Sequence, residues 1–362
     1  MTDLRGWIER TVRTDVQART AYAVADPGTA IRLNQMENPF GWPADLWRAC
    51  MESLSGAEIN RYPDAAGREL IAAIRAHDDL DDAWGVMLGN GSDEIIQPLI
   101  QAICDGARPV MAPAPSFVMF EVIAGQCRVP YVGVDLNRDF SLDADGLIAA
   151  MQRHNPALLF LAQPNNPTGN LYDEADLRRV IEACPGLVII DEAYGPFSSR
   201  NHQSWLGQYP NLLVMRTFSK MGLAGLRCGY LVGDVAWIEQ INKVRLPYNL
   251  GVLNQAVARF ALTEGRAVLA QQSAALRVGR DQLFDALSAR GLRVHPSEAN
   301  FMLLEVDQPS AVNASIAAQG VLIKDLSKAH PMLARCLRVS IGTDAENAAF
   351  LAALDVALKA QR

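Results

Sequence analysis

Short apolar runs alternate with helical segments between residues 86 and 232 of this chain. Within each run, polar and apolar residues do not alternate, which is the pattern of strands that are covered on both faces. Such strands, separated by helices, form a mostly parallel sheet between layers of helices. We expect strands at 86–88, 109–112, 131–134, 157–162, 187–190, 212–217 and 228–232. The alternation therefore predicts an α/β fold, and it constrains the chain more than any other feature of its sequence.

A second pattern begins after about residue 255. It predicts a long helix at 254–289, strands at 300–306 and 337–341, and a last helix at 344–358. These elements indicate a smaller α/β unit that the long helix joins to the first. We therefore expect a large domain over residues 45–255 and a small C-terminal domain over residues 256–362. Residues 1–44, which include an amphipathic segment at 8–16, would form an arm that lies on the rest of the protein and packs with the small domain.

The composition disfavours several classes of partner. The formal net charge of the 362 residues is -7, which provides no basic surface for nucleic acid and disfavours an anionic membrane. The first residues contain no apolar signal segment, and the longest apolar runs are far shorter than a membrane span. The six cysteines and five histidines are dispersed without a C-x-x-C pair or the spacing of a metal site. We expect a soluble cytoplasmic protein that binds no metal, nucleic acid or membrane.

The stretch 217–227 places Lys220 among small and hydroxyl residues, directly after the expected strand 212–217. Burial there would lower the pKa of the lysine amine, because an apolar environment disfavours the charged form. A neutral amine can attack a carbonyl and form a Schiff base. Taken alone, however, a lysine in a glycine-containing loop is more typical of a solvent-exposed surface. The interpretation therefore depends on the residues around it.

Three further groups follow expected strands, at the edge where parallel sheets bind ligands. Asp191 and Tyr194 come after the strand 187–190, so a carboxylate and a phenol could meet a heterocyclic ring. The turn 164–169 contains two prolines, a glycine and an asparagine amide that can be aimed at an acceptor. Residues 89–93 lead into a helix, and backbone N–H groups at a helix start bind phosphate. Taken singly, the three groups also suit a helix cap, a structural turn and an ordinary strand–helix turn.

In this order along the chain, the groups resemble those of the fold-type I aminotransferases that use pyridoxal 5'-phosphate (PLP), over nearly the whole length. Within them, the chain looks like a member of the histidinol-phosphate aminotransferase family. The narrower resemblance rests on the stretches Met36-Glu37-Asn38-Pro39, Arg61-Tyr62-Pro63-Asp64, Gly91-Ser92-Asp93-Glu94, Asn165-Asn166-Pro167-Thr168-Gly169 and Cys336-Leu337-Arg338-Val339. It implies the PLP-dependent transferase fold type I, with a large domain built on a mostly parallel sheet and a smaller α/β C-terminal domain.

The resemblance also implies roles at the cofactor ring. Lys220 would hold PLP as a Schiff base and, once freed, move the proton between the substrate Cα and the cofactor. Asp191 would pair with the pyridine nitrogen and keep it protonated. Asn166 and Tyr194 would hydrogen-bond the ring oxygen. Phe117 would stack on the ring at a position where the family more often has tyrosine, so the stacking persists without that hydroxyl.

The cofactor phosphate would be held by groups from two subunits. The resemblance assigns it to the backbone of Ser92 and Asp93, the hydroxyls of Thr217 and Ser219, and Arg227. Tyr62 matches a family tyrosine that reaches the phosphate from the partner subunit. The resemblance therefore implies a homodimer with a shared active site.

The substrate contacts are implied in the same way. Arg338 would clamp a substrate α-carboxylate in a bidentate pair that lysine cannot reproduce, and Asn38 would border the same pocket. A substrate phosphate would be met by Tyr22 and by the basic residue of an Ile-Arg-Asp stretch, which here reads Ile323-Lys324-Asp325. Lys324 keeps the positive charge but loses the fork of the arginine.

These residues together predict transamination between L-histidinol phosphate, the amino donor, and 2-oxoglutarate, giving imidazole-acetol phosphate and L-glutamate. The same scaffold also suits an aminotransferase for aromatic or other amino acids. It further suits a PLP-dependent decarboxylase of a phosphorylated amino acid, which releases carbon dioxide instead. A non-catalytic PLP-binding regulator would need a DNA-binding segment, for which the chain has no room before residue 32.

Overall fold

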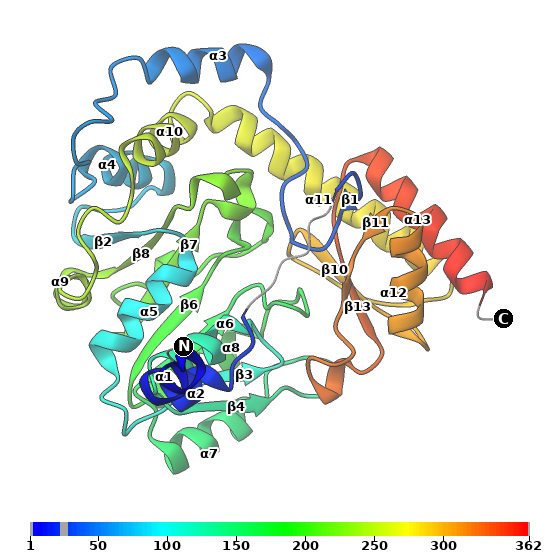
Figure 1. Cartoon of the computed structure of the whole chain (residues 1–362), viewed down its shortest axis with the longest axis horizontal. Coiled ribbons are helices and arrows are strands. Elements are labelled where there is room, and N and C mark those ends of the chain that lie inside the picture. Colours follow the sequence, from blue (N-terminus) through cyan, green and yellow to red (C-terminus); the bar gives the residue numbers. More distant parts are fainter. Residues whose placement is uncertain (1–2, 22–27, 361–362) are drawn as a thin grey trace.

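Seven strands form the central sheet of the computed structural model, which describes residues 3–21 and 28–360 (Figure 1). Their order is β2-β8-β7-β6-β5-β3-β4. The bounds are β2 (Trp84–Gly89), β3 (Val110–Ala114), β4 (Tyr131–Asp135), β5 (Leu158–Ala162), β6 (Leu187–Asp191), β7 (Leu212–Thr217) and β8 (Gly229–Asp234). Strand β8 is antiparallel to β2 and β7, whereas the other neighbouring strands are parallel. The predicted mostly parallel α/β fold is confirmed.

Helices cover the sheet on both faces because alternate residues of a strand point in opposite directions. The helices of this part of the chain are α3 (Ala44–Ser53), which packs on α10, and α4 (Arg68–Asp78), α5 (Ser92–Ile103), α6 (Met119–Gln126), α7 (Ala144–His154), α8 (Glu174–Ala183), α9 (Val235–Asn242) and α10 (Val252–Leu262). Phe160 of β5 stacks on Phe120 of α6, with ring centroids 4.4 Å apart. Its neighbour Leu161 lies instead in an apolar cluster with Leu177 of α8. All residues of β5 and β6 are buried, which explains their unbroken apolar sequence.

A second, smaller sheet is antiparallel throughout and lies on the right in Figure 1. Its strands, in order, are β12 (Lys324–Asp325), β13 (Cys336–Ser340), β10 (Phe301–Glu305) and β9 (Arg293–His295). The helices of this part are α11 (Arg266–Ser288), α12 (Pro309–Ala318) and α13 (Asp344–Lys359). Helix α13 starts with a capping box, in which the Thr343 hydroxyl accepts from the Glu346 N–H and the Glu346 carboxylate accepts from the Thr343 N–H.

The expectation of one continuous helix over residues 254–289 was wrong. Helix α10 ends at Leu262, and α11 begins at Arg266. At the break the Thr263 hydroxyl donates to the carbonyl oxygen of Arg259 at 3.1 Å, and Gly265 follows. A backbone-bonding threonine and a glycine both weaken a helix, so the chain can change direction there. Helix α10 packs against α4, which lies beside the large sheet. Helix α11 continues to the small sheet, where it contacts β9 and β10 (Figure 1).

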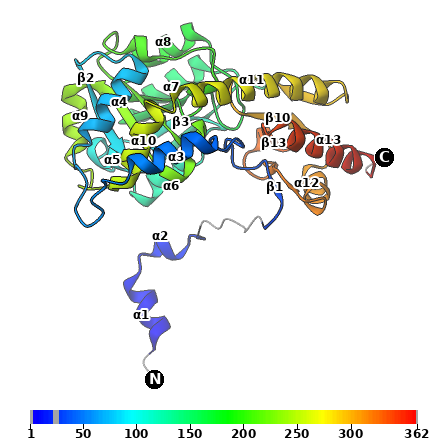
Figure 2. The same cartoon turned by 90° about the horizontal axis from the view of Figure 1, so that it is seen from above.

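The N-terminal segment begins with two short helices and continues into a short strand. Helices α1 (Leu4–Thr11) and α2 (Thr14–Gln17) bury no residue, and Figure 2 shows them projecting away from both sheets. Further along, β1 (Ile31–Arg32) pairs in parallel with β11 (Val321–Leu322) beside the small sheet. The division into residues 1–44, 45–255 and 256–362 stays a prediction.

The described residues contain free thiols and no group of side chains suited to a metal. All six cysteines are unbridged. Nowhere in residues 3–21 and 28–360 do three or more histidine, cysteine, aspartate or glutamate side chains gather so that they could hold a metal ion. Over the same ranges, each helix is too short or too polar to cross a bilayer.

Candidate active site

A cavity of about 350 Å³ opens at the carboxyl edge of the large sheet. The last residues of β5, β6 and β7, which are Ala162, Asp191 and Thr217, all line it. The cavity brings together these residues expected from the sequence: Ser92, Asp93, Phe117, Asn166, Asp191, Tyr194, Thr217, Ser219, Lys220 and Arg227. They come from distant parts of the chain because parallel strands end at the same edge.

Lys220 lies in a 3₁₀ turn, Ser219–Met221, directly after β7. Its amine donates to the carbonyl oxygen of Gln35 at 3.3 Å and lies 5.8 Å from the centre of the Tyr194 ring. Burial, and after it the positive charge of Arg338, lowers the pKa of this amine to about 8. A substantial fraction of Lys220 is therefore neutral near pH 8, as a nucleophilic amine requires.

Asp191 is buried at the end of β6, where its Oδ1 accepts from the backbone N–H of Ala193 at 3.0 Å. Burial, together with the nearby carboxylates of Asp93 and Glu192, raises the pKa of its carboxyl to about 7. A buried carboxylate is costly unless a cation meets it. Asp191 is therefore well suited to accept a hydrogen bond from a protonated ring nitrogen.

Asn166 joins two other polar side chains above the cavity. Its Nδ2 donates to the Tyr194 hydroxyl at 3.0 Å, and its Oδ1 accepts from Nη1 of Arg338 at 2.5 Å. Burial raises the pKa of the Tyr194 hydroxyl, so this group keeps its proton. Because the Tyr194 oxygen already accepts from Asn166, its proton is available for another acceptor.

The turn that carries Asn166 is held by its neighbour. Asn165 is fully buried, and its Nδ2 donates to the Thr168 hydroxyl at 2.7 Å and to the carbonyl oxygen of Pro115 at 3.0 Å. The Asn166-Pro167 peptide is cis. Asn165 thus fixes the turn, and Asn166 is left to face the cavity.

One end of the cavity has the donors that a phosphate group prefers. Helix α5 begins at Ser92, so the first N–H groups there have no partner within the helix. Nη1 of Arg227 donates to the Ser219 hydroxyl at 3.3 Å, and the Thr217 hydroxyl lies 3.1 Å from that of Ser219. Gly91 has a φ of +86°, and a Cβ there would lie 2.7 Å from Nη2 of Arg227. A helix start, two hydroxyls and a guanidinium in a cradle that needs glycine fit a phosphate ester.

Two expected substrate residues, Arg338 and Lys324, are not part of the cavity lining. Arg338 is buried on β13, and its Nη2 also donates to the carbonyl oxygen of Asn34 at 3.2 Å. Lys324 is exposed on β12, directly opposite Arg338 in the strand pair. Residues directly opposite each other in an antiparallel pair share one face of the sheet, so the two cations are neighbours.

The structure places the remaining expected residues elsewhere. Asn38 supports the lysine turn from behind, since its Nδ2 donates to the carbonyl oxygen of Met221 at 3.3 Å and to Gln272 at 3.0 Å. Tyr62 is 81% exposed, away from the cavity of its own chain, and stacks on Tyr248 with ring centroids 4.5 Å apart. Tyr22 lies outside the described residues.

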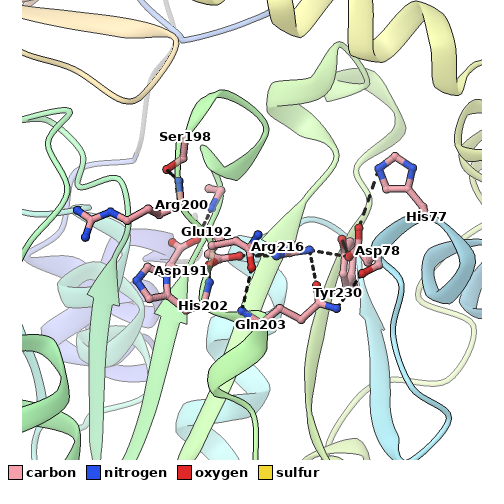
Figure 3. Close-up of polar contacts among 12 residues, drawn as sticks. His77, Asp78, Asp191, Glu192, Ser198, Arg200, His202, Gln203, Arg216 and Tyr230 are labelled. Atoms are coloured by element: carbon pink, nitrogen blue, oxygen red, sulfur yellow. Dashed lines mark hydrogen bonds and ion pairs between the residues drawn. The ribbon is translucent and has the colours of Figure 1, made fainter. Parts of the chain in front are cut away.

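Some residues at the site were not expected from the sequence. Gln35, Met36 and Glu37 line the cavity from the N-terminal segment. The stretch Met36-Glu37-Asn38-Pro39 supported the family resemblance, but only Asn38 was expected at the site. Behind the site lies a buried network around Glu192 and Arg216 (Figure 3). The only sequence signal for that network is that each of its two central residues is adjacent to an expected site residue.

The fold and the site together define a class of protein. A half-buried lysine, a buried carboxylate and a phosphate cradle meet at the carboxyl edge of a mostly parallel sheet, as PLP chemistry requires. Residues 29–354 match the family described as aminotransferase class I and II. The chain belongs to this family, and it is a PLP-dependent aminotransferase.

The names of similar proteins are more specific than the family description. The chain is 45% identical over 358 residues to histidinol-phosphate aminotransferase 2 of Cupriavidus pinatubonensis, covering 97% of this chain and 98% of the relative. It is 47% identical over 352 residues to histidinol-phosphate aminotransferase 1 of Burkholderia mallei, covering 97% and 99%. The solved histidinol-phosphate aminotransferase of Sinorhizobium meliloti, in complex with pyridoxal-5'-phosphate, matches with a TM-score of 0.83, covering 97% and 98%. At 23% identity, that structure supports the fold alone.

Proposed function

We propose that this aminotransferase moves the amino group of L-histidinol phosphate to 2-oxoglutarate, giving imidazole-acetol phosphate and L-glutamate. The observation that carries the substrate choice is the pairing of Lys324 with Arg338 on adjacent strands. Glutamate presents an α-carboxylate, whereas L-histidinol phosphate carries a phosphate ester in its place, one carbon and one oxygen further out. Arg338 alone suits the carboxylate, and a second cation beside it suits the additional charge of the phosphate. The names of the relatives support the same substrate.

Each residue of the cavity has a separate proposed role in the reaction. When bound, PLP supplies an electron sink that makes the Cα proton of the amino donor acidic. Lys220 anchors the cofactor, and its amine, with a pKa of about 8, can afterwards take up and return that proton. Asp191 would hold the protonated ring nitrogen, because its buried carboxylate gains most from a cationic partner. The Tyr194 hydroxyl and the Asn166 amide would donate to the ring oxygen, and Phe117 would lie against the ring.

The phosphate of the cofactor would lie in the cradle at the start of α5. The donors would be the N–H groups of Ser92 and Asp93, the hydroxyls of Thr217 and Ser219, and Arg227. These groups would hold the cofactor independently of Lys220. A fixed phosphate keeps the ring in register while the lysine amine is free.

We also propose a homodimer with a shared active site, working in the cytoplasm. Tyr62 is exposed on its own chain beside Tyr248, as expected for a side chain that enters a partner's site. The exposed Trp7 and Ile8 of α1 would also be covered in a dimer. The unbridged cysteines suit a reducing compartment.

The test is an assay of the purified protein with PLP, L-histidinol phosphate and 2-oxoglutarate. We expect equimolar glutamate and imidazole-acetol phosphate, and much slower turnover of phenylalanine. Faster turnover of phenylalanine would replace the proposed substrate with an aromatic amino acid. Release of labelled carbon dioxide from a phosphorylated amino acid would replace transamination with decarboxylation.

A further inference from the structure

Two neighbouring strand ends point charged side chains to the side opposite the PLP cavity. Asp191 lines the PLP cavity, whereas the adjacent Glu192 and Arg216 line a second cavity of about 380 Å³, and Thr217 borders both cavities. This division follows from the alternation of side chains along β6 and β7. The backbone N–H of Glu192 still donates to Met215 of β7 at 2.8 Å, so the alternation persists past the end of β6.

Buried Glu192 and half-buried Arg216 form an ion pair with further hydrogen bonds (Figure 3). Nε and Nη2 of Arg216 donate to Oε2 of Glu192 at 2.9 and 2.7 Å. The other carboxylate oxygen, Oε1, accepts from the backbone N–H of His202 at 2.6 Å and lies 3.0 Å from its Nδ1. Glu192 is only 1% exposed, so both its oxygens are satisfied without solvent.

Arg216 also joins a second carboxylate. Its Nη1 donates to Oδ2 of Asp78 at 2.8 Å and to Oε1 of Gln203 at 3.2 Å. The hydroxyl of Tyr230 on β8 donates to the same Asp78 oxygen. One guanidinium thus lies between two carboxylates, and it connects the end of β6 to the end of α4.

The Glu192–Arg216 pair affects the active site because Glu192 is adjacent to Asp191. The charged groups that act on Asp191 are Asp93 from α5, the adjacent Glu192, and Lys220 from the turn after β7. Two of the three are carboxylates, and like charges disfavour the ionised form of Asp191. Asp191 must nevertheless be ionised to hold a protonated ring nitrogen.

We propose that Arg216 is a positioning residue for Asp191 and acts through Glu192. Its guanidinium neutralises the Glu192 carboxylate and fastens the ends of β6 and β7 together, so that Asp191 faces the cofactor as an anion. The inference rests on the proposed role of Asp191 toward PLP. It adds a residue outside the cavity to the machinery that keeps the ring nitrogen protonated.

The pKa of the Glu192 carboxyl supports the proposal that Arg216 neutralises its charge. Burial alone would raise its pKa, yet Arg216 and His202 together hold it below its usual value. Glu192 therefore remains ionised beside Asp191, and its charge is balanced from the far side. Without Arg216, an uncompensated buried carboxylate would be adjacent to Asp191, and both carboxyls would bind protons more tightly.

The experiment measures PLP binding by full-length protein freed of cofactor, as a function of pH between about 6 and 9. The variants are Arg216→Met, Arg216→Lys, Glu192→Gln and the double variant Glu192→Gln/Arg216→Met, each checked for folding by thermal unfolding. Binding weakens as pH falls through the range in which Asp191 gains a proton. In Arg216→Met this fall moves to higher pH, by about one unit, the lower end of what a neighbouring charge produces.

The other variants separate charge from mere structural support. In the double variant the pH dependence returns toward that of the wild type, because the charge beside Asp191 is gone. Glu192→Gln alone moves the fall to lower pH, and this decides the question if Arg216→Met does not fold. Arg216→Lys, which keeps the charge, stays near the wild type. Equal shifts in Arg216→Met and the double variant would overturn the inference, as would an unshifted Glu192→Gln.

A failure of the proposed function looks different in the same experiment. Wild-type protein that does not bind PLP would remove the role of Asp191 itself. So would an Asp191→Asn variant whose PLP affinity and its pH dependence match the wild type. In either case the proposed role of Asp191 toward PLP fails, and the Glu192 and Arg216 variants would not be expected to change PLP binding.

Discussion

Nη1 of Arg338 donates to Oδ1 of Asn166 at 2.5 Å, although the two residues are 172 positions apart in the chain. Arg338 lies on β13 of the small sheet, and Asn166 lies in the turn after β5 of the large one. The contact places the proposed substrate cation directly on an amide of the proposed cofactor site. This hydrogen bond therefore couples the proposed substrate contacts to the proposed cofactor contacts.

Arg338→Lys should lower kcat/KM for glutamate and for L-histidinol phosphate by roughly two orders of magnitude. Lysine keeps the charge, but it cannot hold Asn166 and form a forked pair with an anion at the same time. Steady-state kinetics with both donors measures the effect. Arg335→Lys, which changes an exposed arginine on the same part of the chain, is the matched control and should leave kcat/KM unchanged. Equal loss in both variants would contradict the assignment of Arg338.

Lys220→Ala should reduce turnover by about three orders of magnitude or more without unfolding the protein. The amine is the only group proposed to hold the cofactor covalently and to move the Cα proton. Its removal should not destabilise the fold, because burial disfavours the charged amine. The measurements are single-turnover kinetics and a thermal melt. Appreciable transamination by this variant would remove Lys220 from its central place.

The rate at which cofactor-free protein captures PLP covalently should rise with pH, with a midpoint near 8. The neutral form of Lys220 is the nucleophile, and its pKa is lowered to about 8 from 10.5. Replacing Arg338 by Gln should move the midpoint upward, because the positive charge of Arg338 helps to lower that pKa. Stopped-flow absorbance follows the capture. A midpoint that stays above 10 would indicate a solvent-exposed lysine.

Asp191→Asn should abolish turnover and yet stabilise the cofactor-free protein at pH 8. The pKa of Asp191 is raised to about 7 in the folded protein from 3.8, so ionising it in place costs folding free energy. That cost is full above pH 7 and disappears as pH falls from 7 to about 4, where the unfolded chain also binds the proton. The stability gain should therefore be on the order of a few kcal/mol at pH 8 and shrink with acidification. Urea unfolding at several pH values measures it, and a constant gain would contradict the raised pKa.

Lys324→Gln should lower kcat/KM for L-histidinol phosphate by about tenfold and change that for phenylalanine much less. Phenylalanine has an α-carboxylate for Arg338 but no phosphate for the second cation. Lys324→Arg should restore or improve the use of the phosphorylated donor, because the fork suits phosphate. Lys328→Gln, which removes a lysine four residues further on, is the control. Parallel loss with both donors would separate Lys324 from the phosphate.

Much of the fold follows from the sequence alone. The unbroken apolar runs that became β5 and β6 predicted covered strands, because a strand with helices on both faces has no polar side. The expected strand at 212–217 coincides with β7. The positions of Asp191, Thr217 and Lys220 at one edge also follow, since the carboxyl ends of parallel strands meet there.

Other features are decided only by the tertiary structure, because they depend on what surrounds a residue in space. The pKa values of Lys220 and Asp191 are set by burial and by charges from distant segments. No local pattern pairs Arg338 with Asn166, or shows that Arg216 balances Glu192 behind the site. The sequence by itself thus determined which residues reach the edge of the sheet. Long-range packing decided their protonation and their partners, because burial and charge act through space rather than along the chain.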